Sequence, residues 1–176
     1  MIVVNATVLS NLARANLLKI LEQLFGEIII PLPVYEEILK GIDTGYAFLN
    51  SVDEIVEKGD WVTLALFKDE HEKRLFKNLL DSVGYGEAAG IAIAKRLTLL
   101  NKLNLTGRAL HFFSDDRVAR ETAKKQDVEV SGTLGILKVA VEEGKLSTKE
   151  ADEVLQEMIR GGYRSPIQSA TELLEG

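Results

Sequence analysis

Short apolar runs alternate with amphipathic segments along this chain, and this alternation limits its fold more than any other feature. Residues 1–4 form a β-branched run that stops at a polar residue, which is typical of a buried strand. Apolar residues then recur with helical spacing in residues 17–25, and residues 27–30 predict a second buried strand before Pro31. Strands that alternate with helices predict an α/β fold of three α/β/α layers with a mostly parallel central sheet.

The rest of the chain continues this pattern. We predict further strands at residues 61–67, 109–113 and 128–130. We predict further helices at residues 34–39, 69–82, 87–97, 117–125, 133–141 and 151–159. For residues 61–67 an edge hairpin and a crossover connection both remain open, and residues 42–60 are ambiguous.

Composition limits the class of protein further. The chain has 176 residues, of which 46% are hydrophobic and 27% charged, as in an ordinary folded domain. We expect residues 1–176 to form a single domain, with the C-terminal helices from about residue 147 packed on it. Because the chain has no cysteine, a disulfide framework, a thiolate metal site and a cysteine nucleophile are excluded.

Charge and hydropathy limit the partners. The net charge is -6, so a whole-surface electrostatic attraction to nucleic acid is not expected, and any such contact must use a local basic patch. The apolar run at residues 1–4 is too short for a signal peptide, and no segment approaches the roughly 20 apolar residues of a membrane span. We therefore predict a cytoplasmic protein without membrane contact.

Polar side chains stand where the predicted strands end. Asn5 follows the first strand, Glu37 lies on the helix after the second, Asp116 follows the strand at 109–113, and Glu87 opens the alanine-rich helix. Ligands collect beyond the carboxyl ends of parallel strands, so we expect these four side chains to converge. Oxygen ligands of this kind suit Mg²⁺ or Mn²⁺, which bind through one or two carboxylates, water and substrate phosphate.

Each of these residues also has an ordinary structural interpretation. Asp116 is well placed to cap the helix that begins at Arg117, and Glu87 is a first-turn acid favoured by the helix dipole. Glu37 on a helix is more often solvated than functional, and Asn5 is a common turn former. Their shared position at one end of the sheet favours the functional interpretation.

Other motifs give weaker signals. The glycines of residues 84–90 follow a helix rather than a strand, which argues against a dinucleotide-binding loop. His71 and His111 lack metal-ligand spacing, so zinc is not expected. Residues 132–135 (GTLG) come between a strand and a helix, where either a phosphate-binding turn or a simple capped helix start is consistent with the sequence.

Four segments carry a resemblance to a known family. They are MIVVNATVLSNLARANLLKILEQLFGEIIIPLPVYEEI, GYGEAAGIAIAK, FFSDDRVARETAKKQDVEVSGTLGIL and GGYRSP. Together they resemble a prokaryotic subgroup of PIN domains, similar to VapC-type toxin ribonucleases of VapBC-type toxin–antitoxin pairs. The resemblance covers nearly the whole chain, apart from residues 42–82 and 98–107.

The resemblance implies a set of site residues. PIN nucleases hydrolyse RNA with an acidic quartet around one or two Mg²⁺ or Mn²⁺ ions. The matching positions here are Asn5, Glu37, Glu87 and Asp116, of which Asn5, Glu87 and Asp116 would be metal ligands. The first position is normally aspartate, and the amide of Asn5 brings neither negative charge nor a base.

The resemblance also implies residues that contact the substrate. Ser114 matches a small hydroxyl before the fourth acid, Asp115 is an auxiliary acid, and Thr7 matches a polar residue of the first loop. In a ribonuclease of this kind, Arg117, Arg120 or Arg14 would be available to neutralise phosphate. The implied partners are RNA, an antitoxin protein and a second copy in a homodimer.

Two hypotheses follow. In the first, the chain is a divalent-metal-dependent ribonuclease, the toxin of a toxin–antitoxin pair or an enzyme derived from one. In the second, which the substitution at Asn5 favours, it is a catalytically weak or inactive PIN module that binds nucleic acid or a partner protein.

Overall fold

The computed structural model describes residues 1–103 and 111–174. Across these residues five strands form one sheet in the order β3-β2-β1-β4-β5, and every neighbouring pair is parallel. The strands are β1 (Ile2–Val4), β2 (Ile28–Pro31), β3 (Val62–Ala65), β4 (His111–Phe113) and β5 (Glu129–Ser131). The prediction of a parallel α/β sheet is confirmed.

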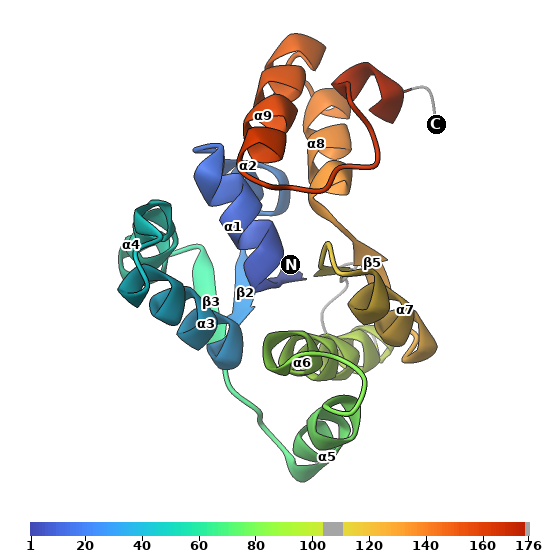
Figure 1. Cartoon of the computed structure of the whole chain (residues 1–176). Coiled ribbons are helices and arrows are strands. Elements are labelled where there is room, and N and C mark those ends of the chain that lie inside the picture. The colour runs from blue at the N-terminus through green and yellow to red at the C-terminus, as the bar shows by residue number, and fades with distance from the viewer. Residues whose placement is uncertain (104–110, 175–176) are drawn as a thin grey trace.

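The helices connect these strands and cover both faces of the sheet (Figure 1). They are α1 (Ala6–Arg14), α2 (Lys19–Phe25), α3 (Leu32–Asp43), α4 (Asn50–Lys58), α5 (Glu70–Leu79), α6 (Tyr85–Lys102), α7 (Arg117–Lys125), α8 (Thr133–Glu142) and α9 (Thr148–Arg160). Two short 3-10 turns, η1 (Ala47–Leu49) and η2 (Ala170–Leu173), complete the described elements.

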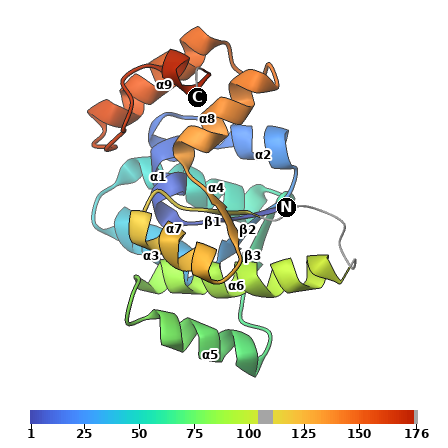
Figure 2. The same cartoon turned by 90° about the vertical axis from the view of Figure 1, so that its right-hand side faces the viewer.

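Alternation along the strands creates two cores, because successive side chains of a strand point to opposite faces. Val3, Ile29 and Phe112 are buried on the face that α5, α6 and α7 cover. Their strand neighbours are buried on the other face, against α1, α2, α3, α4 and α8. Figure 2 shows the sheet between these layers, with α6 and α5 below it and α1, α2, α8 and α9 above.

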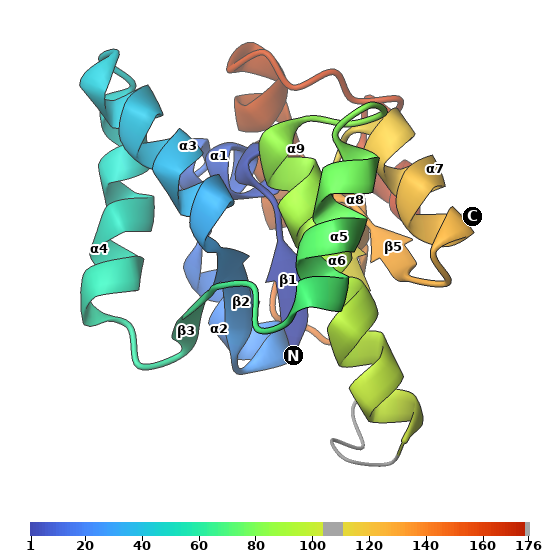
Figure 3. The ribbon, with the colours of Figure 1, turned by 90° about the horizontal axis from the view of Figure 1, so that it is seen from below.

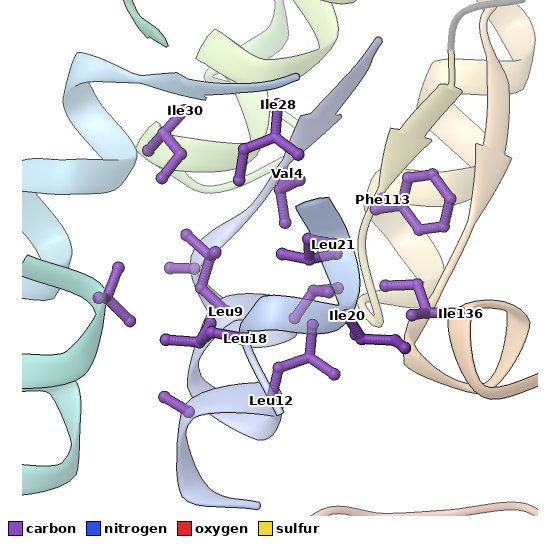
Figure 4. Packing of buried hydrophobic residues seen from close by; sticks show 14 of the residues in the cluster. Val4, Leu9, Leu12, Leu18, Ile20, Leu21, Ile28, Ile30, Phe113 and Ile136 are labelled. Carbon is purple, nitrogen blue, oxygen red and sulfur yellow. The ribbon is translucent and has the colours of Figure 1, made fainter. Parts of the chain in front are cut away.

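The upper core is built around the first helices of the chain. Figure 4 shows Val4, Ile28 and Ile30 from the strands directed toward Leu9 and Leu21 of α1 and α2. These side chains are almost completely inaccessible to solvent, so the hydrophobic effect anchors the N-terminal helices to the sheet. The C-terminal end of β1, and the residue that follows it, are thereby held at a defined position.

The lower core depends on the alanine-rich helix α6, which packs against β1, β2 and β4 and lies beside α5 in Figure 3. Its alanines and isoleucines are buried on most sides, as its composition predicts. A Cβ atom at Gly90 would lie 2.4 Å from the ring of Phe112, so only glycine permits this close approach of α6 to β4.

The structure resolves the two open segments. Residues 42–60 contain the end of α3, then η1 and α4. Strand β3 pairs in parallel with β2, with Ile28 beside Val62, so residues 61–67 follow a crossover and the edge-hairpin alternative is wrong.

Several boundaries differ from prediction. Helix α1 was not predicted, since the polar residues that cap and end it interrupt the apolar pattern. Helix α6 begins at Tyr85, with Gly84 as its N-cap, so Glu87 lies in the third helical position rather than the first. Strand β5 is displaced by one residue from the predicted 128–130, and residues 109–110 of the predicted fourth strand lie outside the described residues.

The C-terminal part packs on the helical layer that contains α1 and α8. Helix α9 contacts both of these helices, and η2 contacts α8 and α9. The segment between α9 and η2 passes the start of α8 (Figure 1). Within the described ranges, no helix is both long and apolar enough to cross a membrane.

Candidate metal and nucleic-acid site

The candidate site lies where the sheet changes direction. The chain moves from β1 toward β2 and β3 on one side, and later returns to β4 and β5 on the other. Between β1 and β4, connections therefore leave in opposite directions, and this switch point is where parallel sheets bind ligands. Asn5 directly follows β1 and Ser114 directly follows β4, and the Asn5 N–H donates to the carbonyl of Phe113 at 3.0 Å.

Asn5 is buried, and all its hydrogen-bonding capacity is used inside the protein. Its Oδ1 accepts from the backbone N–H of Thr7 at 2.6 Å and from the Thr7 hydroxyl at 2.7 Å. Its Nδ2 donates to Glu87 Oε1 at 3.0 Å and to Ser114 Oγ at 3.1 Å. An amide has two donor hydrogens and an oxygen with two lone pairs, so no lone pair of Asn5 remains for a metal ion.

Glu87 is held by Asn5 on one side and by the start of α6 on the other. Glu87 lies in the first turn of this helix, where a negative charge is favoured by the free N–H groups. A Cβ atom at Gly84 would lie 2.5 Å from Glu87 Oε2, so the carboxylate folds back over this glycine. Among the described residues no protein group donates a hydrogen bond to Oε2, which is left for a cation or water.

Glu37 comes from α3 and places its carboxylate beside the same helix end. The side chain is exposed along much of its length, but its Oε2 would lie 2.9 Å from a Cβ atom at Gly86. Partial burial of the carboxylate raises the pKa of Glu37, the negative charge of Glu87 raises it further, and Lys40 acts in the opposite direction. Two carboxylates thus repel each other at this position.

Asp116 joins the two parts of the site. Its Oδ1 accepts from the N–H of Ala119 at 2.6 Å and caps α7, while its own N–H donates to Ser114 Oγ at 3.2 Å. Asp116 lines one pocket with Glu87 and a second pocket with Glu37, so it stands between these two acids. Asp116 therefore both caps α7 and lines the pockets of the site.

These residues fit a weakly held cation better than a compact metal cage. Across residues 1–103 and 111–174, no group of three or more His, Cys, Asp or Glu side chains lies close enough to hold a metal ion. Mg²⁺, however, needs only one or two carboxylates with water in its other positions. Glu87 and Asp116 each keep one oxygen without a donor from the described residues, so they fit a hydrated Mg²⁺ or Mn²⁺.

Asp115 has a different environment from Asp116, although both were predicted at the site. Its Oδ1 accepts from the N–H of Thr133 at 2.8 Å, and its Oδ2 accepts from Asn11 Nδ2 at 2.9 Å and from the Thr133 hydroxyl at 2.5 Å. The hydroxyl of Tyr163 also hydrogen-bonds to Asp115. Asp115 thus ties together α1, the start of α8 and the segment after α9.

Tyr163 is a site residue that sequence reasoning did not select. Burial raises the pKa of the Tyr163 hydroxyl, the charge and hydrogen bond of Asp115 raise it further, and Arg120 lowers it. Tyr163 and Arg164 line the pocket that contains Glu37 and Asp116. The GGYRSP segment was the available signal, but only the path of the chain after α9 brings it to this site.

The remaining predicted residues divide into two groups. Thr7 lines the pocket with Glu37 and Asp116. Arg117 and Arg120 line a neighbouring pocket on the other side of Asp115. Arg14 places its guanidinium 4.0 Å from the ring centroid of Phe48, a packing role at a distance from the acids that was not expected.

A parallel α/β/α domain with acids at its switch point has the architecture of a PIN domain, a nuclease fold. A family model described as DUF3368: PIN domain matches residues 1–176, and the chain belongs to this family. Comparisons with curated proteins and with solved structures give no match.

Proposed function

We propose that this PIN domain is a divalent-metal-dependent ribonuclease. The observation that carries the proposal is the arrangement of Glu87 and Asp116 at the switch point of the sheet, each with one oxygen that accepts no hydrogen bond from the described residues. Nothing in the described part of the chain neutralises these two carboxylates through an ion pair. A bound cation would relieve their repulsion and that of Glu37.

Each residue of the site has a distinct role in this proposal. Glu87 and Asp116 hold the ion, and Glu37 contributes a third negative charge at the mouth of the pocket. Asn5 is a positioning residue, because its amide fixes Glu87 and Ser114 and has no free lone pair. A bound Mg²⁺ or Mn²⁺ would supply the chemistry of polarising a phosphate oxygen and activating a water molecule.

The finer parts of the proposal rest on the resemblance to VapC-type ribonucleases. We propose RNA as the substrate, a cytoplasmic location, a second copy of the chain in a homodimer and an antitoxin protein as partner. The site is consistent with RNA, since the groove of the acids continues into a region with several cationic side chains.

A second candidate is a PIN module that binds nucleic acid or protein without cleaving it. This candidate is favoured by Asn5, which stands at the position of a first metal-binding acid. The side chain of Asn5 makes four hydrogen bonds within the protein instead. The two candidates differ in one property, since a nuclease must bind a divalent ion and a binding module need not.

A cleavage assay tests the proposal. Structured and unstructured RNA is incubated with the protein and Mg²⁺, Mn²⁺ or EDTA. The wild type is compared with Glu87→Gln, which keeps an oxygen to accept from Asn5, and with Glu36→Gln, a control on the exposed part of α3. We expect cleavage with a metal ion, none with EDTA, a large loss in Glu87→Gln and no change in Glu36→Gln. Metal-independent RNA binding without cleavage by the wild type would favour the second candidate.

A further inference from the structure

A basic pocket lies next to the acids but is separate from them. It has a volume of about 410 Å³ and lies between α7, the first turn of α8 and residues 163–166. Its cationic lining consists of Arg117, Arg120, Lys124 and Arg164. We propose that this basic pocket binds a phosphate group of the nucleic-acid strand other than the phosphate that is cleaved, an inference that rests on the proposed function.

The lining of the basic pocket has a net positive charge, because four cationic side chains stand against the two carboxylates of Asp115 and Glu121. The carboxylate of Asp115 also lines the pocket, but it is already bound by Asn11, Thr133 and Tyr163. Glu121 makes a long contact of 3.4 Å to Arg117, and both of these side chains are well exposed. In the part of the chain that the structure describes, neither Lys124 nor Arg164 forms an ion pair. Two cationic side chains without a carboxylate partner, in a lining of net positive charge, attract phosphate.

The backbone at the floor of the pocket is close to the arginines, although one of its donors, the N–H of Thr133, is already taken by Asp115 Oδ1. A Cβ atom at Gly132 would lie 2.6 Å from Asp115 Oδ1 and 3.2 Å from Arg120 Nη1, so a larger residue would displace both side chains. Leu134 and Gly135, in the first turn of α8, also line the pocket. The N–H groups of a first turn have no partner in their own helix, and the helix dipole adds partial positive charge to that of the arginines.

The position of the basic pocket fits a strand that also crosses the acids. Asp115, Tyr163 and Arg164 line both the basic pocket and the pocket that contains Glu37 and Asp116. Arg117, Arg120 and Lys124 follow Asp116 at helical spacing along one side of α7. With a rise of about 1.5 Å per residue, Lys124 lies about 10 Å beyond Arg117 along the helix axis. A phosphate bound in the basic pocket is therefore a different one from the phosphate that is cleaved beside Glu87 and Asp116.

Binding measurements in EDTA test this inference without depending on cleavage. The probes are inorganic phosphate, followed by the thermal midpoint, and a single-stranded RNA oligonucleotide with either a 5′-phosphate or a 5′-hydroxyl, followed by fluorescence anisotropy. The test variant is Lys124→Ala/Arg164→Ala, and the matched control is Lys149→Ala/Arg74→Ala; all four side chains are exposed, so both variants should fold. Circular dichroism confirms the fold of each variant.

We expect the test variant to bind the RNA about 10-fold or more weakly than the wild type, while the control changes less than about 2-fold. The slope of log K against log salt should fall by about 0.7 for each phosphate that the variant no longer neutralises. Equal losses for both oligonucleotides would assign the pocket to an internal phosphate, and a loss confined to the 5′-phosphorylated one would assign it to a terminal phosphate. Stabilisation by inorganic phosphate in the wild type and the control variant, but not in the test variant, would support a phosphate site even if RNA cleavage is never observed. Test and control variants that match the wild type with both probes would overturn the inference and leave the ribonuclease proposal intact.

Discussion

Asp115 and Asp116 are adjacent acids at the end of the same strand, yet the fold gives them opposite environments. Asp115 is half-buried, and both of its oxygens accept hydrogen bonds from other elements. Asp116 is exposed, caps α7 with Oδ1 and lines two pockets, and its Oδ2 accepts no hydrogen bond from the described residues. A carboxylate whose lone pairs are satisfied by the protein stabilises the fold, and one with a free lone pair can bind a cation.

The comparison separates an acid that stabilises the fold, Asp115, from an acid that is available to bind a cation, Asp116. The contacts of Asp115 connect residues more than 100 positions apart in the chain, from Asn11 to Tyr163. The contacts of Asp116 are local, to Ser114 and Ala119. Loss of Asp115 should therefore act mainly on stability, and loss of the Asp116 charge mainly on metal binding and cleavage.

The largest expected effect is that of Asp115→Ala on stability. The substitution leaves the buried hydroxyl of Thr133, together with Asn11 and Tyr163, without an acceptor, which should lower the free energy of unfolding by about 3 kcal/mol. Urea denaturation measures the change. A variant as stable as the wild type would show that the hydrogen bonds of Asp115 do not stabilise the fold, and the comparison would fail.

The next effect is that of Asp116→Asn on cleavage. The amide oxygen can still cap α7, so the urea midpoint should stay near that of the wild type. Loss of the negative charge should reduce the rate of metal-dependent RNA cleavage by about 100-fold, equivalent to about 2.7 kcal/mol. Asp81→Asn, at an exposed position after α5, is the control and should cleave normally. A strongly destabilised Asp116→Asn would instead make Asp116 a second structural acid.

A smaller effect is expected for Asn5→Asp, which tests how the first position of the quartet works. An aspartate oxygen in place of Nδ2 would face Glu87 Oε1, now 3.0 Å away, as a like charge instead of a donor. Without metal we expect a loss of about 2 kcal/mol in the free energy of unfolding. Mn²⁺ should restore part of this loss, so the variant should gain more thermal stability from Mn²⁺ than the wild type does.

Asn5→Ala serves as the control for that measurement, because it removes the amide without adding charge. It should lose stability as well, since Glu87 and Thr7 lose their partner, but it should gain nothing extra from Mn²⁺. If Mn²⁺ stabilises Asn5→Asp no more than it stabilises Asn5→Ala, the side chain at position 5 does not face a bound cation.

The smallest effect concerns pH and Glu37. The pKa of Glu37 is raised in the folded protein, so its contribution to stability is fully present below the unfolded pKa, near 4.5, and is lost as pH rises through the folded pKa. The free energy of unfolding of Glu37→Gln, relative to that of the wild type, should therefore be higher at pH 7 than at pH 4. The difference should be less than about 1 kcal/mol, because solvent screens this group. Urea midpoints at both pH values measure the difference, with the neighbouring exposed Glu36→Gln as the matched control.

The sequence by itself determined the layers of the fold and the end of the sheet at which the site lies. Alternation of apolar strands and amphipathic helices dictates a covered parallel sheet, because each element must bury one or both faces. Asn5, Glu87 and Asp116 could be selected because each lies shortly after a strand or in the first turn of a helix, and those positions are local in the chain. The glycine between β5 and α8 could be interpreted either as a turn or as part of an anion site for the same reason.

Only the tertiary structure decided what each of these residues does. Whether a carboxylate oxygen is free depends on donors that arrive from distant segments, such as Asn11 and Thr133 at Asp115. The orientation of the Asn5 amide depends on Glu87, 82 positions away, and on Ser114. The basic pocket exists because residues 163–166 return to the side of α7. Hydrogen bonds and electrostatic fields act over a few ångströms in space whatever the separation in sequence, so the free and the satisfied acids could be told apart only after the chain had folded.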